Sequence, residues 1–121
     1  MNRSKQIMIA DDDDAILDAL GAMLEYKGYD VRQVLNGKGI TEMEHDLPDL
    51  LLLDIWMSGV DGRDICKKLK ATSKTAKIPI VLFSASKDIH SSAIEAGAND
   101  FLAKPFEIEE LYKIIELHTA G

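Results

Sequence analysis

The chain has 121 residues, of which 46% are hydrophobic, and a formal net charge of −7. This length predicts a single globular domain with its own core, and the acidic balance argues against nonspecific nucleic-acid binding and against docking on anionic membranes. The single cysteine excludes an internal disulfide. Because no apolar run approaches about 18 residues and the N-terminus is short and polar, we expect a cytoplasmic protein without a membrane span.

The N-terminal half alternates short apolar runs with segments of helical periodicity. We expect strands over residues 7–10 and 29–34. Helices are expected over residues 14–27 and 37–45, where apolar side chains recur at steps of three and four. Asp14 is the expected N-cap of the first of these helices.

The rest of the chain is organised around a run of four leucines that ends in Asp54. Residues 50–55 show no polar alternation, which is typical of a parallel strand buried on both faces. Ser58 and Gly59 mark a loop after this strand. A helix is expected to follow over residues 62–72.

Two further pairs of strand and helix complete the chain. We expect strands over residues 78–84 and 100–103, and helices over residues 87–96 and 107–118. This alternation predicts an α/β fold with a doubly wound five-stranded parallel sheet and helices on both faces. We adopt the flavodoxin-like strand order 2-1-3-4-5, because it places the most apolar strands at the centre.

Acidic residues end two of the expected central strands. Asp11 and Asp12 follow the first strand, and Asp54 closes the third. In a parallel sheet these ends share one edge, and like charges about 4 Å apart repel by about 4 kcal/mol at an effective dielectric of 20. A divalent cation relieves such repulsion, and a few carboxylate oxygens with water suit magnesium.

Ser84 and Lys104 end the fourth and fifth expected strands at the same edge. Taken alone, Lys104 reads as a surface lysine, and the acidic run from Asp11 reads as a solvated, capping segment. Together with Asp54, however, these residues indicate phosphoryl chemistry. A carboxylate would be the nucleophile, while a metal, a hydroxyl and an ammonium would hold the phosphoryl oxygens.

The sequence resembles the receiver domains of two-component response regulators, including the chemotaxis regulators, over nearly its whole length. The matching segments are IMIADDD at 7–13, PDLLLLDIWMSGVDG at 48–62, IPIVLFSAS at 78–86 and GANDFLAKPF at 97–106. Each segment alone is a weak signal, whereas the combination is specific.

The resemblance implies a role for each residue at this edge. Asp54 would be the phosphoacceptor, which takes a phosphoryl group from a phosphohistidine. Asp12 and Asp54 would bind Mg²⁺ (or Mn²⁺) directly and Asp11 through water, and the backbone carbonyl of Trp56 would be a further ligand. Lys104 would pair with the acyl phosphate.

The resemblance also implies a switch. Ser84 would bind a phosphoryl oxygen and move toward it, and Phe101 would then move inward. The face formed by residues 87–96, 100–103 and 107–118 would change shape as a result. The Lys104–Pro105 peptide bond is expected to be cis.

The expected partners follow from the same family. A sensor histidine kinase or a histidine phosphotransfer protein would donate the phosphoryl group, and the downstream target is not specified by the sequence. We expect a monomer rather than a homodimer, no direct contact with nucleic acid, and no enzymatic activity beyond the chain's own phosphorylation and dephosphorylation. Residues 1–121 are expected to form one receiver domain without an output domain.

Three alternatives stay open. An aspartyl-phosphate phosphatase of the haloacid dehalogenase kind needs a second acid two residues after its nucleophile, where this chain has Trp56. A flavodoxin would repel its cofactor phosphate from the acidic run after the first strand. A degenerate receiver would act only as a protein-interaction module.

Two residues after Asp54 depart from the pattern of the receiver family. Ser58 stands where the family often has proline, and we expect bulky Trp56 to shield the acyl phosphate from water.

Overall fold

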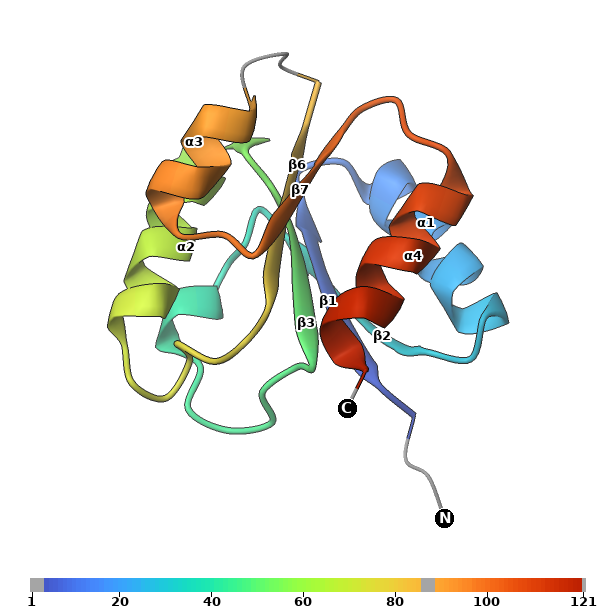
Figure 1. Cartoon of the computed structure of the whole chain (residues 1–121), viewed down its shortest axis with the longest axis horizontal. Coiled ribbons are helices and arrows are strands. Elements are labelled where there is room, and N and C mark those ends of the chain that lie inside the picture. The colour runs from blue at the N-terminus through green and yellow to red at the C-terminus, as the bar shows by residue number, and fades with distance from the viewer. Residues whose placement is uncertain (1–3, 86–88, 121) are drawn as a thin grey trace.

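The computed structural model describes residues 4–85 and 89–120. Its centre is a five-stranded parallel sheet with the order β2-β1-β3-β6-β7 (Figure 1). The strands of this sheet are β1 (Gln6–Asp11), β2 (Asp30–Leu35), β3 (Leu50–Asp54), β6 (Ile80–Ser84) and β7 (Asp100–Ala103). The helices are α1 (Asp14–Tyr26), α2 (Gly62–Ala71), α3 (Ile89–Ala96) and α4 (Ile108–Thr119). The predicted fold class and strand order are confirmed.

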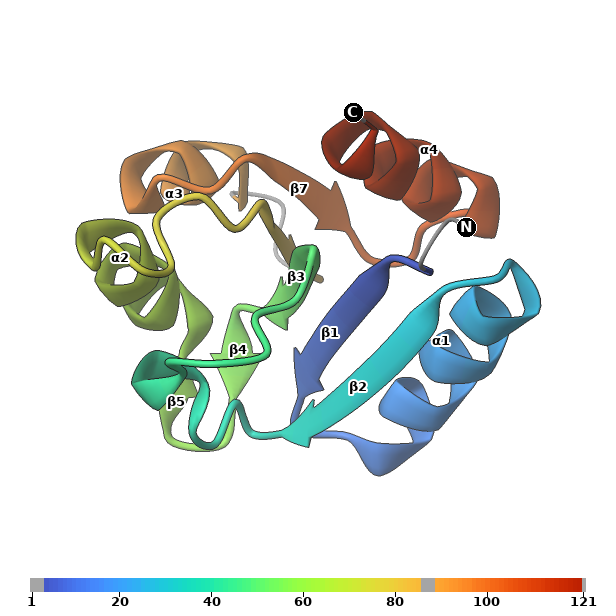
Figure 2. The ribbon, with the colours of Figure 1, turned by 90° about the horizontal axis from the view of Figure 1, so that it is seen from below.

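Helices cover both faces of the sheet. Figures 1 and 2 show α1 and α4 on one face and α2 and α3 on the other. Strand β3 is buried along its whole length. Leu50 and Leu52 pack in the core under α1 and α4, whereas Leu51 and Leu53 pack in the opposite core. The leucine run therefore fills two cores at once, because successive side chains of a strand point to opposite faces.

One expected helix, over residues 37–45, is wrong. Only a 3₁₀ turn, η1 (Ile40–Glu42), forms there. The backbone φ angles of Asn36, Gly37 and Gly39 are 58°, 67° and 81°, which place all three in the left-handed region that a right-handed helix excludes. The chain turns here instead, and Ile40 is the buried anchor of the turn.

Several boundaries differ from the sequence-based expectations. Asp13 rather than Asp14 caps α1, since its carboxylate accepts a hydrogen bond from the Ala15 amide at 2.9 Å. Strand β6 begins at Ile80 rather than at residue 78, because Pro79 has no amide hydrogen for the ladder. The first two residues of the expected helix 87–96 lie outside the described residues.

The expected loop after Asp54 contains a small antiparallel hairpin. Strand β4 (Trp56–Met57) pairs with β5 (Val60–Asp61) across a turn in which Gly59 has φ 70°. Asp61 then caps α2, because its carboxylate accepts a hydrogen bond from the Arg63 amide at 2.9 Å. The hairpin thus returns the chain directly to the end of β3.

Gly62 begins α2 in close contact with the end of β3. Its amide donates a hydrogen bond to the Ile55 carbonyl oxygen at 2.7 Å. A side-chain Cβ at this position would overlap the backbone carbonyl oxygen of Asp54. Glycine is therefore needed here for close approach, and this contact fixes the backbone of Asp54.

None of the helices within residues 4–85 and 89–120 combines the length and the apolar character that a membrane span needs.

Replacing Gly62 by alanine should lower the free energy of unfolding by about 1–3 kcal/mol, because the added methyl group must displace backbone. Gly21→Ala is the matched control. A Cβ at Gly21 would come too close only to the end of the flexible Gln33 side chain and would make an ordinary contact with Val31, and alanine favours a helix over glycine by about 1 kcal/mol. Urea unfolding of both variants measures the difference. Equal effects of the two substitutions would contradict the close packing at Gly62.

Candidate functional site

Four of the parallel strands bring chemically active residues to one edge of the sheet. Asp11 is the last residue of β1, Asp54 the last of β3 and Ser84 the last of β6, while Lys104 directly follows β7. The strands are parallel and adjacent in register, with Asp54 opposite Phe83 and Ser84 opposite Ala103. The predicted convergence of these residues at the carboxyl edge is confirmed.

Three carboxylates form the acid cluster, which consists of Asp11, Asp12 and Asp54. One carboxylate oxygen from each lies within 4.8 Å of the others. Asp11 is 1% exposed and Asp54 is 5% exposed, whereas Asp12 is open to solvent. The cluster therefore has a buried floor and one solvent-facing carboxylate.

Lys104 is the cation that faces the acid cluster. Its Nζ lies 3.4 Å from Asp11 Oδ2 and 3.7 Å from Asp54 Oδ1. The same ammonium lies 4.5 Å from the centre of the Phe83 ring, an arrangement that favours a cation over an aromatic face. The Lys104 amide donates to the Ser84 carbonyl oxygen at 2.8 Å, so the backbone of β6 holds this lysine in place. The Lys104–Pro105 bond is cis, as expected.

The electrostatics of the cluster are unbalanced. Burial raises the pKa of Asp54 to about 6, and the charges of Asp11 and Asp12 also raise it. The Lys104 ammonium and a hydrogen bond from the Trp56 amide oppose this shift. Burial also raises the pKa of Asp11, against the attraction of Lys104 and a hydrogen bond from the Asp13 amide. A single ammonium therefore does not offset three carboxylates.

This donor set fits a hard divalent cation. Carboxylate oxygens are the ligands that magnesium prefers, and it binds through a few of them while keeping several waters. Asp11, Asp12 and Asp54 supply such oxygens within reach of one ion. Burial raises the pKa of Asp11 and of Asp54 because it disfavours their charged forms, and a divalent cation would favour those charged forms.

The other expected site residues lie nearby. Ser84 is 1% exposed at the end of β6. The backbone of Trp56 adjoins the acid cluster, since its amide hydrogen-bonds to the Asp54 carboxylate. Phe101 is half-buried on β7, and its side chain packs against the core under α2 and α3. The roles of these three residues in catalysis or switching stay predictions.

Some contacts at the site were not anticipated from the sequence. The Ser58 hydroxyl donates to Asp12 Oδ2 at 3.2 Å, so the residue that replaces the family's frequent proline ties the hairpin to the acid cluster. The Arg63 guanidinium lies 4.8 Å from the centre of the Trp56 ring. The Ser58–Gly59 pair is a signal for a turn, but no sequence signal identifies these side-chain partners.

The sequence is similar to those of known proteins. The sequence matches the model of the response regulator receiver domain over residues 7–116. It is 39% identical over 109 residues to the DNA-binding dual master transcriptional regulator RpaA of Synechocystis sp., an alignment that covers 88% of this chain and 45% of that protein. The chain thus spans about half the length of the curated relatives it matches first.

Solved structures agree with the sequence matches. A putative response regulator from Chloroflexus aurantiacus superposes with a TM-score of 0.90 at 33% identity, covering 98% of this chain and 100% of that one. The receiver domain of the sensor histidine kinase PA1611 from Pseudomonas aeruginosa superposes with a TM-score of 0.87 at 26% identity, covering 98% and 100%. That structure has a magnesium ion coordinated in its active-site cleft.

Asp54→Asn should raise the stability of the metal-free protein near neutral pH. The unfolded carboxyl group loses its proton near pH 3.8, whereas the folded protein retains it to about 6. Stability therefore falls as pH rises between these values and stays lower above them. Because one pKa unit corresponds to about 1.4 kcal/mol, the gain in Asp54→Asn is at most about 3 kcal/mol. Urea unfolding in chelator-treated buffer, at about pH 7.5 and about pH 4, measures it.

Asp18→Asn is the control for this experiment, since it makes the same charge change at an exposed position of α1. It should leave stability nearly unchanged at both pH values. An advantage of Asp54→Asn that persists undiminished near pH 4 would contradict the assigned cause.

Proposed function

We propose that this chain, which belongs to the response regulator receiver domain family, accepts a phosphoryl group onto Asp54 from a phosphohistidine donor. The observation that carries the proposal is the buried Asp54 carboxylate, which has the Lys104 ammonium at 3.7 Å. Oxygens of Asp11 and Asp12 lie within 4.8 Å of it. A carboxylate nucleophile beside a fixed cation and a candidate metal site is the arrangement that phosphoryl transfer requires.

Each neighbour of Asp54 would have one task in this reaction. Lys104 would pair with the oxygens of the transferred group, and Ser84 would donate its hydroxyl to one of them. Asp12 and Asp54 would hold magnesium, or manganese, directly, with Asp11 acting through water and the Trp56 carbonyl as a further ligand. When bound, the ion supplies positive charge to the phosphoryl oxygens. The magnesium ion in the related PA1611 receiver domain supports this choice.

The signal would leave through the face formed by α3, β7 and α4. Phosphorylation would favour a state in which Ser84 moves toward the phosphoryl group and Phe101 moves further inward. Phe101 starts half-buried on β7, and it has no hydroxyl with which to hydrogen-bond to a partner. We infer that its effect is one of packing, which changes the shape of this face.

The proposed donor is a sensor histidine kinase or a histidine phosphotransfer protein, and the proposed target is a downstream protein that reads the altered face. We propose that this chain acts in the cytoplasm as a monomer and makes no direct contact with nucleic acid. The relative RpaA is described as DNA-binding, but this chain aligns with only 45% of it. Self-phosphorylation and self-dephosphorylation would be its only reactions.

The alternatives have less support. A phosphatase would need a second acid where Trp56 stands, and the side chain of Trp56 instead contacts the Arg63 guanidinium. A degenerate receiver would lack part of the reactive set. Here the acid cluster and Lys104 lie together at contact distance.

The direct test is a covalent one. Incubation with acetyl phosphate and magnesium should add one phosphoryl group to the intact protein, as measured by mass spectrometry, because the proposed acceptor Asp54 lies in the acid cluster with the Lys104 ammonium at 3.7 Å. Asp54→Asn should abolish the gain. Asp14→Asn, at an exposed acid of the same N-terminal run, should retain it, and equal loss in both variants would argue against Asp54 as the acceptor.

Trp56 should lengthen the lifetime of the phosphorylated state. Trp56 is 56% exposed, and its amide hydrogen-bonds to the Asp54 carboxylate. Arg63, which is itself paired with Asp61 at 2.7 Å, lies 4.8 Å from the centre of the ring and restrains it. Trp56→Asn should raise the dephosphorylation rate several-fold, since water would reach the acyl phosphate more freely. Arg63→Ala keeps the indole and should have a smaller effect. An unchanged rate in Trp56→Asn would exclude shielding.

A further inference from the structure

Phe83 lies next to the cation of the site. It is the residue before Ser84 at the end of β6, and it stands opposite Asp54 of β3 in the parallel register. The residue is fully buried in the core under α1 and α4. The Lys104 ammonium lies 4.5 Å from the centre of its ring, inside the range of about 6 Å over which an aromatic face attracts a cation. Phe83 therefore belongs both to the apolar core and to the charged site.

The carboxylates hold the Lys104 ammonium only loosely. Its Nζ is 3.4 Å from Asp11 Oδ2 and 3.7 Å from Asp54 Oδ1. Both distances exceed the roughly 2.7–2.9 Å of a charge-assisted hydrogen bond between an ammonium and a carboxylate. Lysine also carries its charge at the end of a flexible four-carbon chain. Attraction to the carboxylates alone therefore leaves the position of Nζ poorly defined.

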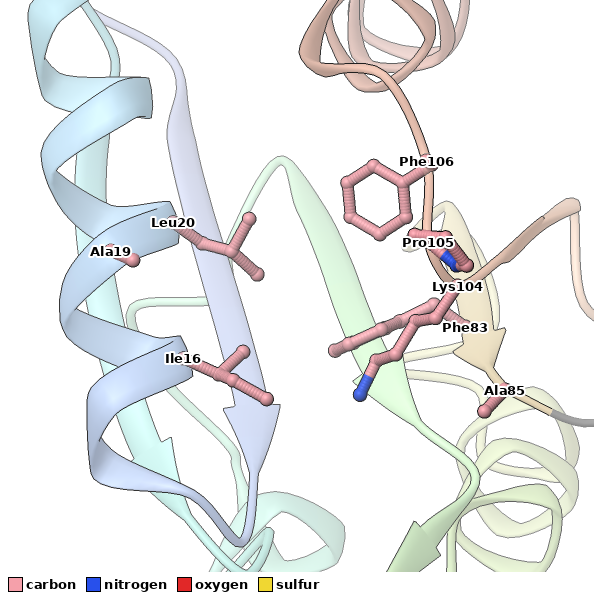
Figure 3. A pocket seen from close by; sticks show the side chains of 8 residues that line it. All are labelled: Ile16, Ala19, Leu20, Phe83, Ala85, Lys104, Pro105 and Phe106. Atoms are coloured by element: carbon pink, nitrogen blue, oxygen red, sulfur yellow. The ribbon is translucent and has the colours of Figure 1, made fainter.

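The surroundings of Lys104 also leave room for its side chain. An apolar pocket of about 420 Å³ lies between α1 and the segment that follows β7, and its lining includes Ile16, Phe83 and Lys104 (Figure 3). The Lys104 amide is fixed by its hydrogen bond to the Ser84 carbonyl oxygen at 2.8 Å, but the pocket leaves the side chain open toward α1. The Phe83 ring restrains the ammonium where packing does not.

We infer that Phe83 is a positioning residue for the phosphoacceptor, because the face of its ring holds the Lys104 ammonium beside Asp54. The inference rests on the proposed function of Asp54. A leucine would fill a similar place in the core, but it has no aromatic face to attract a cation. Phe83 thus has a task at the site in addition to its packing in the core.

The ring restrains the ammonium without occupying its hydrogen bonds to oxygen. An ammonium has three N–H donors, and a carbonyl or carboxylate partner at hydrogen-bond distance would take one of them. The Phe83 ring instead attracts the charge as a whole. Donors of Lys104 therefore stay available for the oxygens of a transferred phosphoryl group.

The attraction of the ring does not depend on the charge of the acid cluster. A divalent cation bound by this cluster would compete with Lys104 for the same carboxylate oxygens. The Phe83 ring has no net charge, so a cation in the cluster leaves its attraction for the ammonium in place. Phe83 therefore keeps Lys104 at the site in the state in which we propose that phosphoryl transfer occurs.

The position of Lys104 can be measured without metal or substrate. Because the ring current of an aromatic face moves nearby proton resonances upfield, the ε-methylene protons of Lys104 should lie upfield of those of an exposed lysine such as Lys67 in NMR spectra. Phe83→Leu should abolish this displacement. Phe106→Leu should retain it, since Phe106 packs against the same core but Figure 3 shows its ring beyond Pro105, away from the Lys104 Nζ. The displacement should remain after magnesium is added.

Fluorination of the ring tests whether its effect on the reaction is electrostatic. Mono-, di- and trifluorinated phenylalanine at position 83 weaken the negative ring face in steps, while the ring stays apolar and similar in size, so the core is kept. The rate of phosphorylation by acetyl phosphate with magnesium, followed by intact mass, should fall with each step. Phe83→Leu should lower this rate about threefold to tenfold, whereas Phe106→Leu should stay close to the parent rate.

The outcomes separate this inference from the proposed function. A parent protein that gains no phosphoryl group would overturn both. Equal rates for the parent and the trifluorinated protein would retain Asp54 as the acceptor and overturn the role of Phe83. Lys104 resonances that are unchanged in Phe83→Leu, or that lose their displacement with magnesium, would also overturn it, because the ammonium would then not be held over the ring.

Discussion

The site depends on an imbalance of charge at the carboxyl edge of a parallel sheet. Three carboxylates meet there, two of them almost fully buried, and the Lys104 ammonium is the cation that contacts them. Burial is the main reason why the pKa values of Asp11 and Asp54 are raised, and the charges of Asp11 and Asp12 raise the pKa of Asp54 further. A divalent cation would reduce this excess of negative charge. The same excess that destabilises the metal-free fold therefore favours binding of the proposed cation.

Backbone contacts help to hold these charged residues in place. Gly62 lies against the carbonyl of Asp54 because it has no Cβ, and the Lys104 amide is bonded to the Ser84 carbonyl at 2.8 Å. The end of β3 and the end of β7 are thereby tied to their neighbours. In the proposed switch, a movement of Ser84 would act on β7 through this backbone bond, toward the α3–β7–α4 face.

Lys104 also connects two environments of opposite character. On one side its ammonium faces buried carboxylates, and on the other its carbon chain lines an apolar pocket against α1. Long cationic side chains often bridge polar and apolar surroundings in this way. In this protein the bridge places an apolar surface of α1 next to Asp54, the proposed phosphoacceptor.

The sequence by itself determined the order of elements and the convergence of Asp11, Asp12, Asp54, Ser84 and Lys104, because parallel strands with short apolar runs bring their carboxyl ends to one edge. It did not predict the turn at Gly37 and Gly39 in place of a helix, since periodicity reads side chains and not left-handed backbone angles. Only the tertiary structure decided which partners the site residues have, such as Ser58 on Asp12, Phe83 under Lys104 and the apolar wall of α1. Those contacts join residues far apart in the chain, and their distances depend on how whole elements pack rather than on any local pattern.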